Sequence, residues 1–372
     1  MSAKAPVPEV KVSLYGMTDV GMVRTNNEDT FLVVELTTCR AGLSPENLNH
    51  MVQERGTLLL VSDGMGGAEA GEVASRLVVE QMFEGLREVP LDDHPEGAVR
   101  AAVERANTEI WNQAQQNARQ HGMGATLAAA WIRGTDGWIT GVGDSRVYML
   151  RSGKMRQITR DQSMVESLVE AGMIDRAAAE LHPQRNVILQ AMGSRPEVVV
   201  AIDRVELRRG DFLLLCSDGL SGKISAEEMR DSILTTPALP DACHRMVQMA
   251  KDRGGEDKIT VVVAEFDGEG LAETTLNERM TRTLQSVSGF NFRAGAGYAP
   301  PPPVKPTLTL GSESNEPEPP PPPVVTDPLD GEPTRSFGGE RHPAPSRRGT
   351  PTAIIGTENM PKPPDPDKKS ES

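Results

Sequence analysis

Three aspartates stand at corresponding places in this chain, each at one end of an apolar run. Asp63 follows LLLVS and Asp218 follows LLLCS, and a glycine comes directly after both. Asp257 stands immediately ahead of KITVVV, with two glycines just upstream. A buried strand holds a carboxylate in place, and glycine lets a backbone carbonyl come close to a ligand. Because a hard divalent cation requires oxygen ligands in fixed positions, the pattern predicts a metal site.

The alternative is that these aspartates belong to turns. Asp-Gly is the commonest pair in hairpin turns, so a single copy after a strand is more often a turn than a ligand. The segments 58–67 and 213–222 are nearly identical, however, and a turn does not require its flanking strands to match. The repetition therefore favours metal binding.

The elements that must position these residues alternate along the chain. Strands are expected at 10–19, 30–36, 57–63, 125–132, 137–144, 146–152, 197–207, 211–218 and 259–266. Helices are expected at 70–87, 96–119, 163–171, 226–234 and 240–252. Short hairpin-like turns such as RGTDGW and RSGKM join several strands. This favours an α+β fold with antiparallel sheets and helices outside, and it disfavours a doubly wound parallel sheet.

The bulk composition excludes several classes. The 372 residues carry a formal net charge of -14, which disfavours binding to nucleic acid through its phosphates. Cys39, Cys216 and Cys243 are odd in number and lack a CxxC spacing, so a disulfide framework is not expected. The sequence shows no apolar stretch of signal-peptide or membrane-span length. We expect a soluble, cytoplasmic protein with no membrane or nucleic-acid partner.

Proline divides the chain into two regimes. Of the 29 prolines, 20 fall within 300–372, in runs such as PPPP and PEPPPPP. We therefore expect one folded domain over 8–267 and a disordered, proline-rich tail over 293–372. The tail is a candidate ligand for a protein that binds proline-rich motifs.

The segment 268–292 between these regimes is expected to be a helix or a linker. Its stretch 271–287 puts four apolar residues on one helical face: Leu276, Met280, Leu284 and Val287. A helix docked on the domain and a frayed polar helix are both consistent with this pattern.

Eight motifs, taken in chain order, carry a resemblance. They are RTNNED at 24–29, VSDGMGG at 61–67, GEVAS at 71–75, MGATL at 123–127, GDSRVY at 143–148, the segment from LVEAGMI to HPQRNVILQAMG, CSDGL at 216–220 and GGEDKITVVV at 254–263. Over about 8–266 the chain resembles the metal-dependent protein phosphatase family, the 2C-type serine/threonine phosphatases, in their bacterial form. The resemblance implies a β-sandwich of two antiparallel sheets flanked by helices. It also implies two Mn²⁺ or Mg²⁺ ions at one end and a flap over 163–192.

The resemblance assigns the direct ligands of the two ions. Asp63 matches the aspartate that bridges both ions, and Gly64 matches the glycine whose carbonyl binds one of them. Asp218 and Asp257 match the remaining carboxylate ligands.

The resemblance assigns four further roles. Glu28 and Asp29 match the acidic pair that holds the second ion and its waters. Arg24 matches the arginine that binds the substrate phosphate. Asp144 matches the ligand of a third, weaker metal in bacterial members. Arg24 and Asp144 are each also consistent with an ordinary loop or turn residue.

The implied activity is hydrolysis of phosphoserine and phosphothreonine in proteins, which would reverse a cognate serine/threonine kinase. Two divalent ions that share a water lower its pKa, so direct attack without a phosphoenzyme is expected. Phosphoryl transfer needs positioning and charge neutralisation, and Arg24 offers a planar donor fork for two phosphate oxygens.

Two residues depart from the family pattern. Lys258 stands where asparagine commonly follows the last metal-binding aspartate. Its ammonium could compete with metal or reach toward the substrate phosphate. Gln162 stands where the family often has histidine, which could alter flap packing or proton supply. The loop 37–56 is longer than expected for a compact bacterial member.

Rival functions remain at this point. No cysteine has an arginine six positions later, as a C-x5-R loop requires, which disfavours a cysteine phosphatase. No GxxxxGK[ST] motif occurs, which disfavours a P-loop kinase. A pseudophosphatase that binds phosphoproteins without turnover is the serious rival, and Lys258 is the one feature in its favour. In the tail, Ser346, Thr350 and Thr352 lie in a basic patch that a kinase could modify. The composition favours the alternative, an inert solubilising linker.

Overall fold

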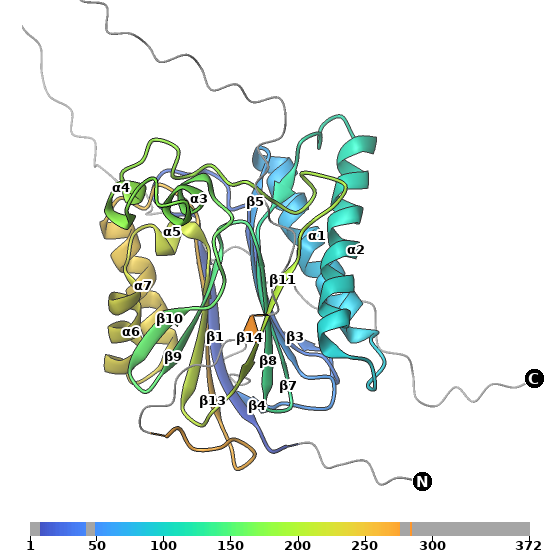
Figure 1. The fold of residues 1–372 in the computed structure, drawn as a ribbon, viewed down its shortest axis with the longest axis vertical. Helices are drawn as coiled ribbons and strands as arrows, with labels where there is room; N and C mark the ends of the chain where they lie inside the picture. The colour runs from blue at the N-terminus through green and yellow to red at the C-terminus, as the bar shows by residue number, and fades with distance from the viewer. Residues whose placement is uncertain (1–7, 42–48, 276–282, 285–372) are drawn as a thin grey trace, which may run out of the picture. The chain divides into compact units, whose positions relative to one another are not determined.

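The computed structural model describes residues 8–41, 49–275 and 283–284. These residues form four layers in which two antiparallel sheets face each other and helices cover both outer faces (Figure 1). The predicted α+β sandwich is confirmed. The expected proline-rich tail, 293–372, lies outside the described residues.

The first sheet has the strand order β10-β9-β12-β13-β1-β4 among the described residues. It is built from β1 (Lys11–Asp19), β4 (Asn49–Met51), β9 (Arg146–Arg151), β10 (Lys154–Gln157), β12 (Asp211–Cys216) and β13 (Ile259–Asp267). All of its pairings are antiparallel. The two strands that flank Asp218 and Asp257, β12 and β13, are direct neighbours.

The second sheet has the order β14-β11-β8-β7-β5-β2-β3, with β6 paired to β5. Its strands are β2 (Asp29–Glu35), β3 (Arg40–Ala41), β5 (Thr57–Met65), β6 (Gly124–Ala125), β7 (Leu127–Arg133), β8 (Asp136–Val142), β11 (Ala201–Glu206) and β14 (Thr283–Leu284). The strands that carry Asp29 and Asp63, β2 and β5, are again direct neighbours.

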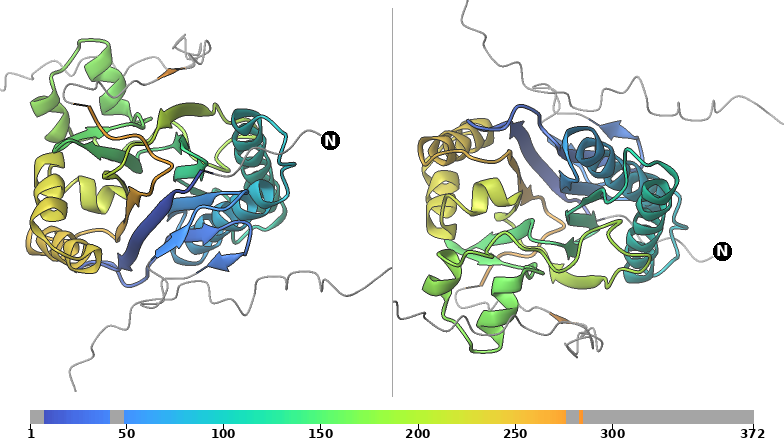
Figure 2. Two further views of the ribbon diagram at one scale, coloured as in Figure 1. Left: turned by 90° about the horizontal axis from the view of Figure 1, so that it is seen from below. Right: turned by 90° about the horizontal axis from the view of Figure 1, so that it is seen from above.

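Helices cover the two sheets from opposite sides. Beside the second sheet lie α1 (Ala68–Arg87) and α2 (Pro95–Gln116), and beside the first lie α6 (Ala226–Thr235) and α7 (Leu239–Asp252) (Figures 1 and 2). The short helices are α3 (Met164–Glu170), α4 (Arg176–Glu180) and α5 (Asp218–Ser221), which lie with the end of β5 at one end of the sandwich (Figure 1). In the part of the chain that the structure describes, no helix is long and apolar enough to cross a membrane.

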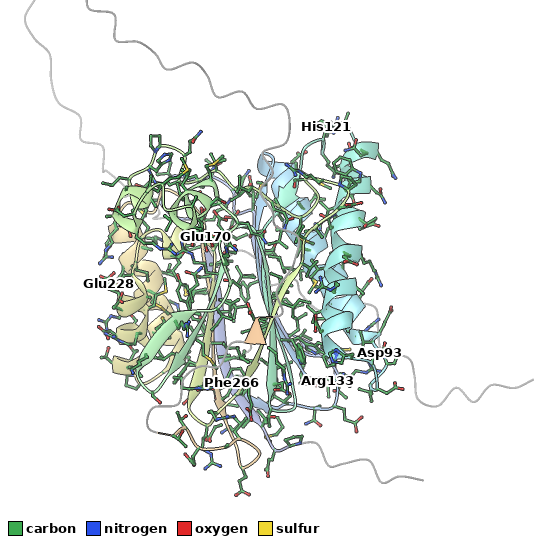
Figure 3. The ribbon with its side chains drawn as sticks, in the orientation of Figure 1. Asp93, His121, Arg133, Glu170, Glu228 and Phe266 are labelled. Carbon is green, nitrogen blue, oxygen red and sulfur yellow. The ribbon has the colours of Figure 1, made fainter. Side chains whose placement is uncertain are left out.

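Three buried apolar clusters bind the four layers together. One fills the space between the sheets and includes Phe266, which Figure 3 shows between them, together with Val61 and Leu215. A second joins α1 and α2 to the second sheet, and a third joins α6 and α7 to the first sheet. Because both faces of each sheet are buried, the central strands are continuous apolar runs, as their sequences indicated.

The nine expected strands are present, with corrections near the site. The strand predicted at 137–144 ends at Val142, and the one predicted at 125–132 is divided into β6 and β7 at Thr126. The strand predicted at 211–218 ends at Cys216, and Asp218 begins α5 instead. The strand predicted at 57–63 continues through Met65. The two short strands β3 and β4 and the strand β10 were not predicted.

Of the two alternatives for 268–292, helix or linker, the helix over 271–287 is contradicted wherever the structure describes this segment. Residues 271–275 are not helical, and Thr283–Leu284 form β14, which pairs antiparallel with Asp203 and Arg204 of β11. The edge of β11 offers unpaired backbone groups, and pairing with them outweighs a weak helical periodicity. Residues 276–282 and 285–292 lie outside the described residues.

Candidate metal centre

The site is built at the end of the sandwich where β2 and β5 bring two carboxylates together. Asp29 and Asp63 are direct partners in the antiparallel register of these strands. The backbone of Asp63 is fixed by Thr126, whose Oγ1 accepts from the Asp63 N–H at 2.9 Å and whose N–H donates to the Asp63 carbonyl at 2.8 Å. The Thr260 hydroxyl donates to Asp29 Oδ2 at 2.6 Å. The strand register therefore places two acidic side chains next to each other.

Glycines allow the loop of Glu28 and the first turn of α1 to close around Asp63. The Gly64 N–H donates to the Glu28 carbonyl at 3.1 Å. A Cβ on Gly64 would lie 2.0 Å from the Gly71 carbonyl oxygen, and one on Gly71 would lie 2.5 Å from Glu28 Oε2. The Gly64 contact is with backbone, so only glycine permits this approach there, whereas at Gly71 the end of the Glu28 side chain would have to move. The approach places Gly64, whose carbonyl the resemblance assigns to a metal, directly against the Glu28 loop and the first turn of α1.

Asp218 and Asp257 are brought together by the pairing of β12 with β13. The Ser217 N–H donates to the Thr260 carbonyl at 3.2 Å, and the Thr260 N–H donates to Ser217 Oγ at 3.0 Å. A Cβ on Gly219 would lie 2.0 Å from the Lys258 carbonyl oxygen, so glycine lets α5 begin directly against the start of β13. The two nearly identical segments thus have different backbone structures, because Asp63 lies within a strand and Asp218 begins a helix.

Two buried carboxylate oxygens have no hydrogen-bond partner among the described residues, Asp29 Oδ1 and Asp218 Oδ1. Burial raises the pKa of Asp218 well above its usual value, and Asp63, Asp144 and Asp257 raise it further. Burial also raises the pKa of Asp29, with Asp63 adding to the effect. Unpartnered buried carboxylates are costly unless a cation compensates them, so this donor set fits divalent metal ions.

Lys258 supplies a cation within this cluster. Its ammonium lies 2.9 Å from Asp63 Oδ1, 3.6 Å from Asp257 Oδ1 and 3.7 Å from Glu28 Oε2. It donates to the Gly64 carbonyl at 3.3 Å, and its side chain is only 5% exposed. Of the two roles that the sequence left open, this position corresponds to competition with metal.

The charge of Lys258 is favoured by its neighbours. Burial lowers the pKa of Lys258, but Asp63 and Asp29 outweigh this effect and leave it raised above its usual value. Among the described residues, no group of three or more His, Cys, Asp or Glu side chains stands already arranged to hold a metal ion. The carboxylates are arranged around an ammonium instead.

Arg24 lies at the edge of the carboxylate cluster. Its Nη2 donates to Asp257 Oδ2 at 2.9 Å, and its side chain is 51% exposed. The hydrogen bond to Asp257 raises the pKa of Arg24, and Glu28 and Asp63 contribute to the same effect. The guanidinium is therefore held beside the predicted ligands and remains accessible from solvent, as a phosphate-binding group must be.

Asp144, the residue that the resemblance assigns to a third metal, follows β8. The neighbouring Ser145 hydroxyl shares a 2.6 Å hydrogen bond with Thr126 Oγ1, which ties this loop to the end of β5. Burial raises the pKa of Asp144 to about 7, with Asp161 and Asp63 adding to the effect. Asp144 thus shares the electrostatic environment of the main cluster.

Gln162 fastens the base of the flap to the loop that carries Asp144. Its Oε1 accepts from the Gly143 N–H at 2.9 Å and from the Gln190 side chain at 3.0 Å, while its carbonyl accepts from the Leu189 N–H at 2.7 Å. These contacts correspond to the flap-packing role. Arg160 forms an ion pair with Glu170 of α3, which joins the same base to this helix. Figure 3 labels Glu170.

All eight predicted site residues therefore lie at one end of the sandwich. Sequence reasoning missed the residues that fix them, Thr126, Ser217 and Thr260, because their hydrogen bonds join segments far apart in the chain. Thr126 lies within the motif MGATL, which was a usable signal for its region but not for its contacts.

Comparison with known proteins identifies the family. The family model for protein phosphatase 2C matches residues 47–263. PstP of Mycobacterium tuberculosis is 37% identical over 252 residues, which are 66% of this chain and 43% of PstP. PhpP of Streptococcus pneumoniae is 34% identical over 256 residues, which are 68% of this chain and 97% of PhpP. The chain belongs to the protein phosphatase 2C family, the metal-dependent serine/threonine phosphatases, as its motifs predicted.

Solved structures support the same assignment. The crystal structure of PstP/Ppp from Mycobacterium tuberculosis has a TM-score of 0.59 at 35% identity, covering 71% of this chain and 100% of that one. Stp1 from Staphylococcus aureus has a TM-score of 0.63 at 30% identity, covering 72% of this chain and 100% of Stp1. A structure of the PstP catalytic domain in complex with two manganese ions has a TM-score of 0.58 at 34% identity, covering 69% of this chain and 99% of that one.

Proposed function

We propose that this chain removes phosphate from phosphoserine and phosphothreonine in proteins, using two Mn²⁺ or Mg²⁺ ions. The proposal is supported most strongly by two buried carboxylate oxygens, one of Asp29 and one of Asp218, that have no hydrogen-bond partner among the described residues. Asp63 and Asp257 add negative charge beside Asp218. Such a cluster is expensive to bury for structural reasons alone, and bound cations would compensate it.

The ligands proposed for the ions are the residues that the fold brings together. Asp63 would contact both ions, Asp218 and Asp257 would hold one, and the Gly64 carbonyl with Glu28 would hold the other. Asp29 lies next to Asp63 and would support the ions through water. When bound, the ions supply Lewis-acid activation of a water and neutralise charge on the phosphoryl group.

The protein's own contribution is to hold and orient the phosphate. Arg24 is half exposed and fixed by Asp257, so its remaining N–H groups are available to an incoming phosphate. A planar guanidinium can donate to two phosphate oxygens at once, which orients the phosphoryl group as well as attracting it. Gln162 secures the base of the flap to the loop that carries Asp144 and would limit how far the flap opens.

Three finer assignments accompany this function. Asp144 would bind a third, weaker ion, because it lies buried near Asp63 and Asp161. The substrates would be phosphoproteins modified by a cognate serine/threonine kinase, as expected for this family. The protein would act in the cytoplasm, a reducing compartment, which fits its three free cysteines.

The test is hydrolysis of a small aryl phosphate and a phosphothreonine peptide, with Mn²⁺ titrated from zero. Wild type is expected to turn over both substrates only when Mn²⁺ is present, and Asp218→Ala is expected to lose the activity. Asp241→Ala is the control, since this aspartate lies in the exposed first turn of α7 and should behave as wild type.

The competing function is phosphoprotein binding without turnover, which the buried ammonium of Lys258 favours. Wild type that binds Mn²⁺ and the phosphothreonine peptide yet releases no phosphate at any metal concentration would establish the competing function and refute the proposed one.

A further inference from the structure

The ammonium of Lys258 occupies the kind of position that a metal ion takes in an oxygen-lined site. Its nearest oxygens are Asp63 Oδ1 at 2.9 Å, the Gly64 carbonyl at 3.3 Å, Asp257 Oδ1 at 3.6 Å and Glu28 Oε2 at 3.7 Å. Three of these residues, Asp63 and Gly64 of β5 and Glu28 of the loop ahead of β2, thus converge on one nitrogen. The same three residues supply the oxygens proposed above for one of the two divalent ions.

The position of Lys258 is fixed by its backbone. Its N–H donates to Asp257 Oδ1 at 2.8 Å, and its carbonyl lies against Gly219, where no side chain would fit. The next residue begins β13, whose pairing with β12 sets the direction of the chain. The side chain is 5% exposed, so the surrounding residues restrict its conformation and keep the ammonium inside the cluster.

An ammonium and a divalent ion cannot use these oxygens together. Ligand oxygens lie about 2.0–2.1 Å from Mg²⁺, so an ion bound to Asp63 and the Gly64 carbonyl would take two of the oxygens that the ammonium contacts. Two positive charges at such a separation also repel strongly in a buried site. The ion must therefore displace the ammonium, and the ammonium must leave the carboxylate of Asp63.

We propose that Lys258 is a tethered cation that fills one of the two ion positions, the one formed by Asp63, Gly64 and Glu28. This rests on the proposed function, because it presumes that the remaining carboxylates bind metal. The protein then holds one divalent ion tightly, on the side of Asp218 and Asp257. A second ion binds only by displacing the ammonium, which makes its binding the step that sets the metal requirement.

The affinity gap between the two ions should be large. Removing one partner from a buried, hydrogen-bonded charge pair is strongly unfavourable, so the second ion should bind at least about a hundredfold more weakly than the first. Asparagine at this position has no charge and a shorter side chain, so Lys258→Asn should bring the two affinities within about tenfold of each other.

The experiment measures Mn²⁺ binding to the whole chain by isothermal titration calorimetry, with electron paramagnetic resonance at one and two equivalents. Wild type is expected to bind one tight ion, with no exchange-coupled Mn²⁺ pair at two equivalents. Lys258→Asn and Lys258→Met, which both remove the charge, are expected to bind two ions and to show the coupled pair.

The matched control is Lys223→Asn. Lys223 pairs with Glu256, next to Asp257, but it makes none of the four contacts of Lys258, so this variant changes local charge without freeing the position. It is expected to keep the one-ion behaviour of wild type.

Two tight ions and a coupled pair in wild type would overturn the inference, even if neither Lys258 variant folds. A tight ion in wild type with no second ion in either variant would also overturn it. Failure of the proposed function can be distinguished from failure of the inference, because the number of bound ions is measured without any phosphate release. A protein with one tight ion that hydrolyses no phosphate at any Mn²⁺ concentration refutes the function and leaves the inference standing.

Discussion

Asp29 and Asp63 face each other directly across the antiparallel pair formed by β2 and β5. Like charges in this relationship oppose folding, and the raised pKa of Asp29, due to burial and to Asp63, reflects that cost. The described end of the sandwich is therefore arranged for cations at the expense of the stability of the metal-free protein.

Neutralising Asp29 should stabilise the metal-free protein. Asp29→Asn removes one of two opposed carboxylates and keeps an oxygen that can accept from Thr260. We expect the melting temperature without metal to rise by about 2–4 °C, the shift that about 1 kcal/mol produces in a domain of this size. Added Mn²⁺ should raise the melting temperature of wild type more than that of the variant. Calorimetric scans with EDTA and with Mn²⁺ test this, and a lower metal-free melting temperature in the variant would contradict it.

Glycine at position 64 should be essential to the fold around the site. An added Cβ would lie 2.0 Å from the Gly71 carbonyl oxygen, so Gly64→Ala should lower the free energy of unfolding by about 2 kcal/mol or more. Gly97→Ala is the control, because nothing lies within 4 Å of a Cβ there. This helical position should gain about 0.5–1 kcal/mol from alanine. Urea unfolding of both variants checks the pair, and equal effects would argue against the close approach of α1.

Arg24 should act on substrate binding rather than on metal binding. Arg24→Ala should reduce kcat/KM for a phosphothreonine peptide by about 10–150-fold, the loss expected for a hydrogen bond to a charged group. Its Mn²⁺ affinity should not fall, because Asp257 loses a competing cation. Arg24→Lys should recover only part of the activity, since an ammonium lacks the planar fork. A variant with weakened Mn²⁺ affinity and an unchanged kcat/KM at saturating metal would be inconsistent with this role.

Gln162 should control the motion of the flap. Gln162→Ala leaves the Gly143 N–H and the Gln190 amide without their acceptor, at a cost of about 1–3 kcal/mol where these groups are buried. Hydrogen exchange over residues 163–192 should therefore accelerate. Gln53→Ala is the control, since this exposed side chain makes one long hydrogen bond to Met51. Unchanged exchange in the Gln162 variant would show that the flap is held by other contacts.

The sequence was sufficient to predict the antiparallel α+β fold and to single out the carboxylates that gather at one end of it, for physical reasons that particular residues make clear. Buried central strands must be apolar on both faces, so runs such as 58–61 and 259–264 are recognisable on their own. Asp63, Asp218 and Asp257 were recognisable because they adjoin those runs beside glycine.

Other features could not be predicted, because they depend on distant partners. The direction of the Lys258 side chain is set by the pairing of β12 with β13 and by the approach of Gly219, neither of which is local in sequence. Thr283 and Leu284 form a strand because β11 has an open edge, and their own pattern indicated a helix. Asp218 begins a helix although its segment nearly repeats that of Asp63.

The most direct test of the account is phosphate release from a phosphothreonine peptide by the whole chain, measured against Mn²⁺ concentration for wild type and Asp218→Asn. We predict release that is absent in EDTA, rises with Mn²⁺ and is lost in the variant. Release that persists in EDTA, or that is equal in wild type and Asp218→Asn at every Mn²⁺ concentration, would contradict the account.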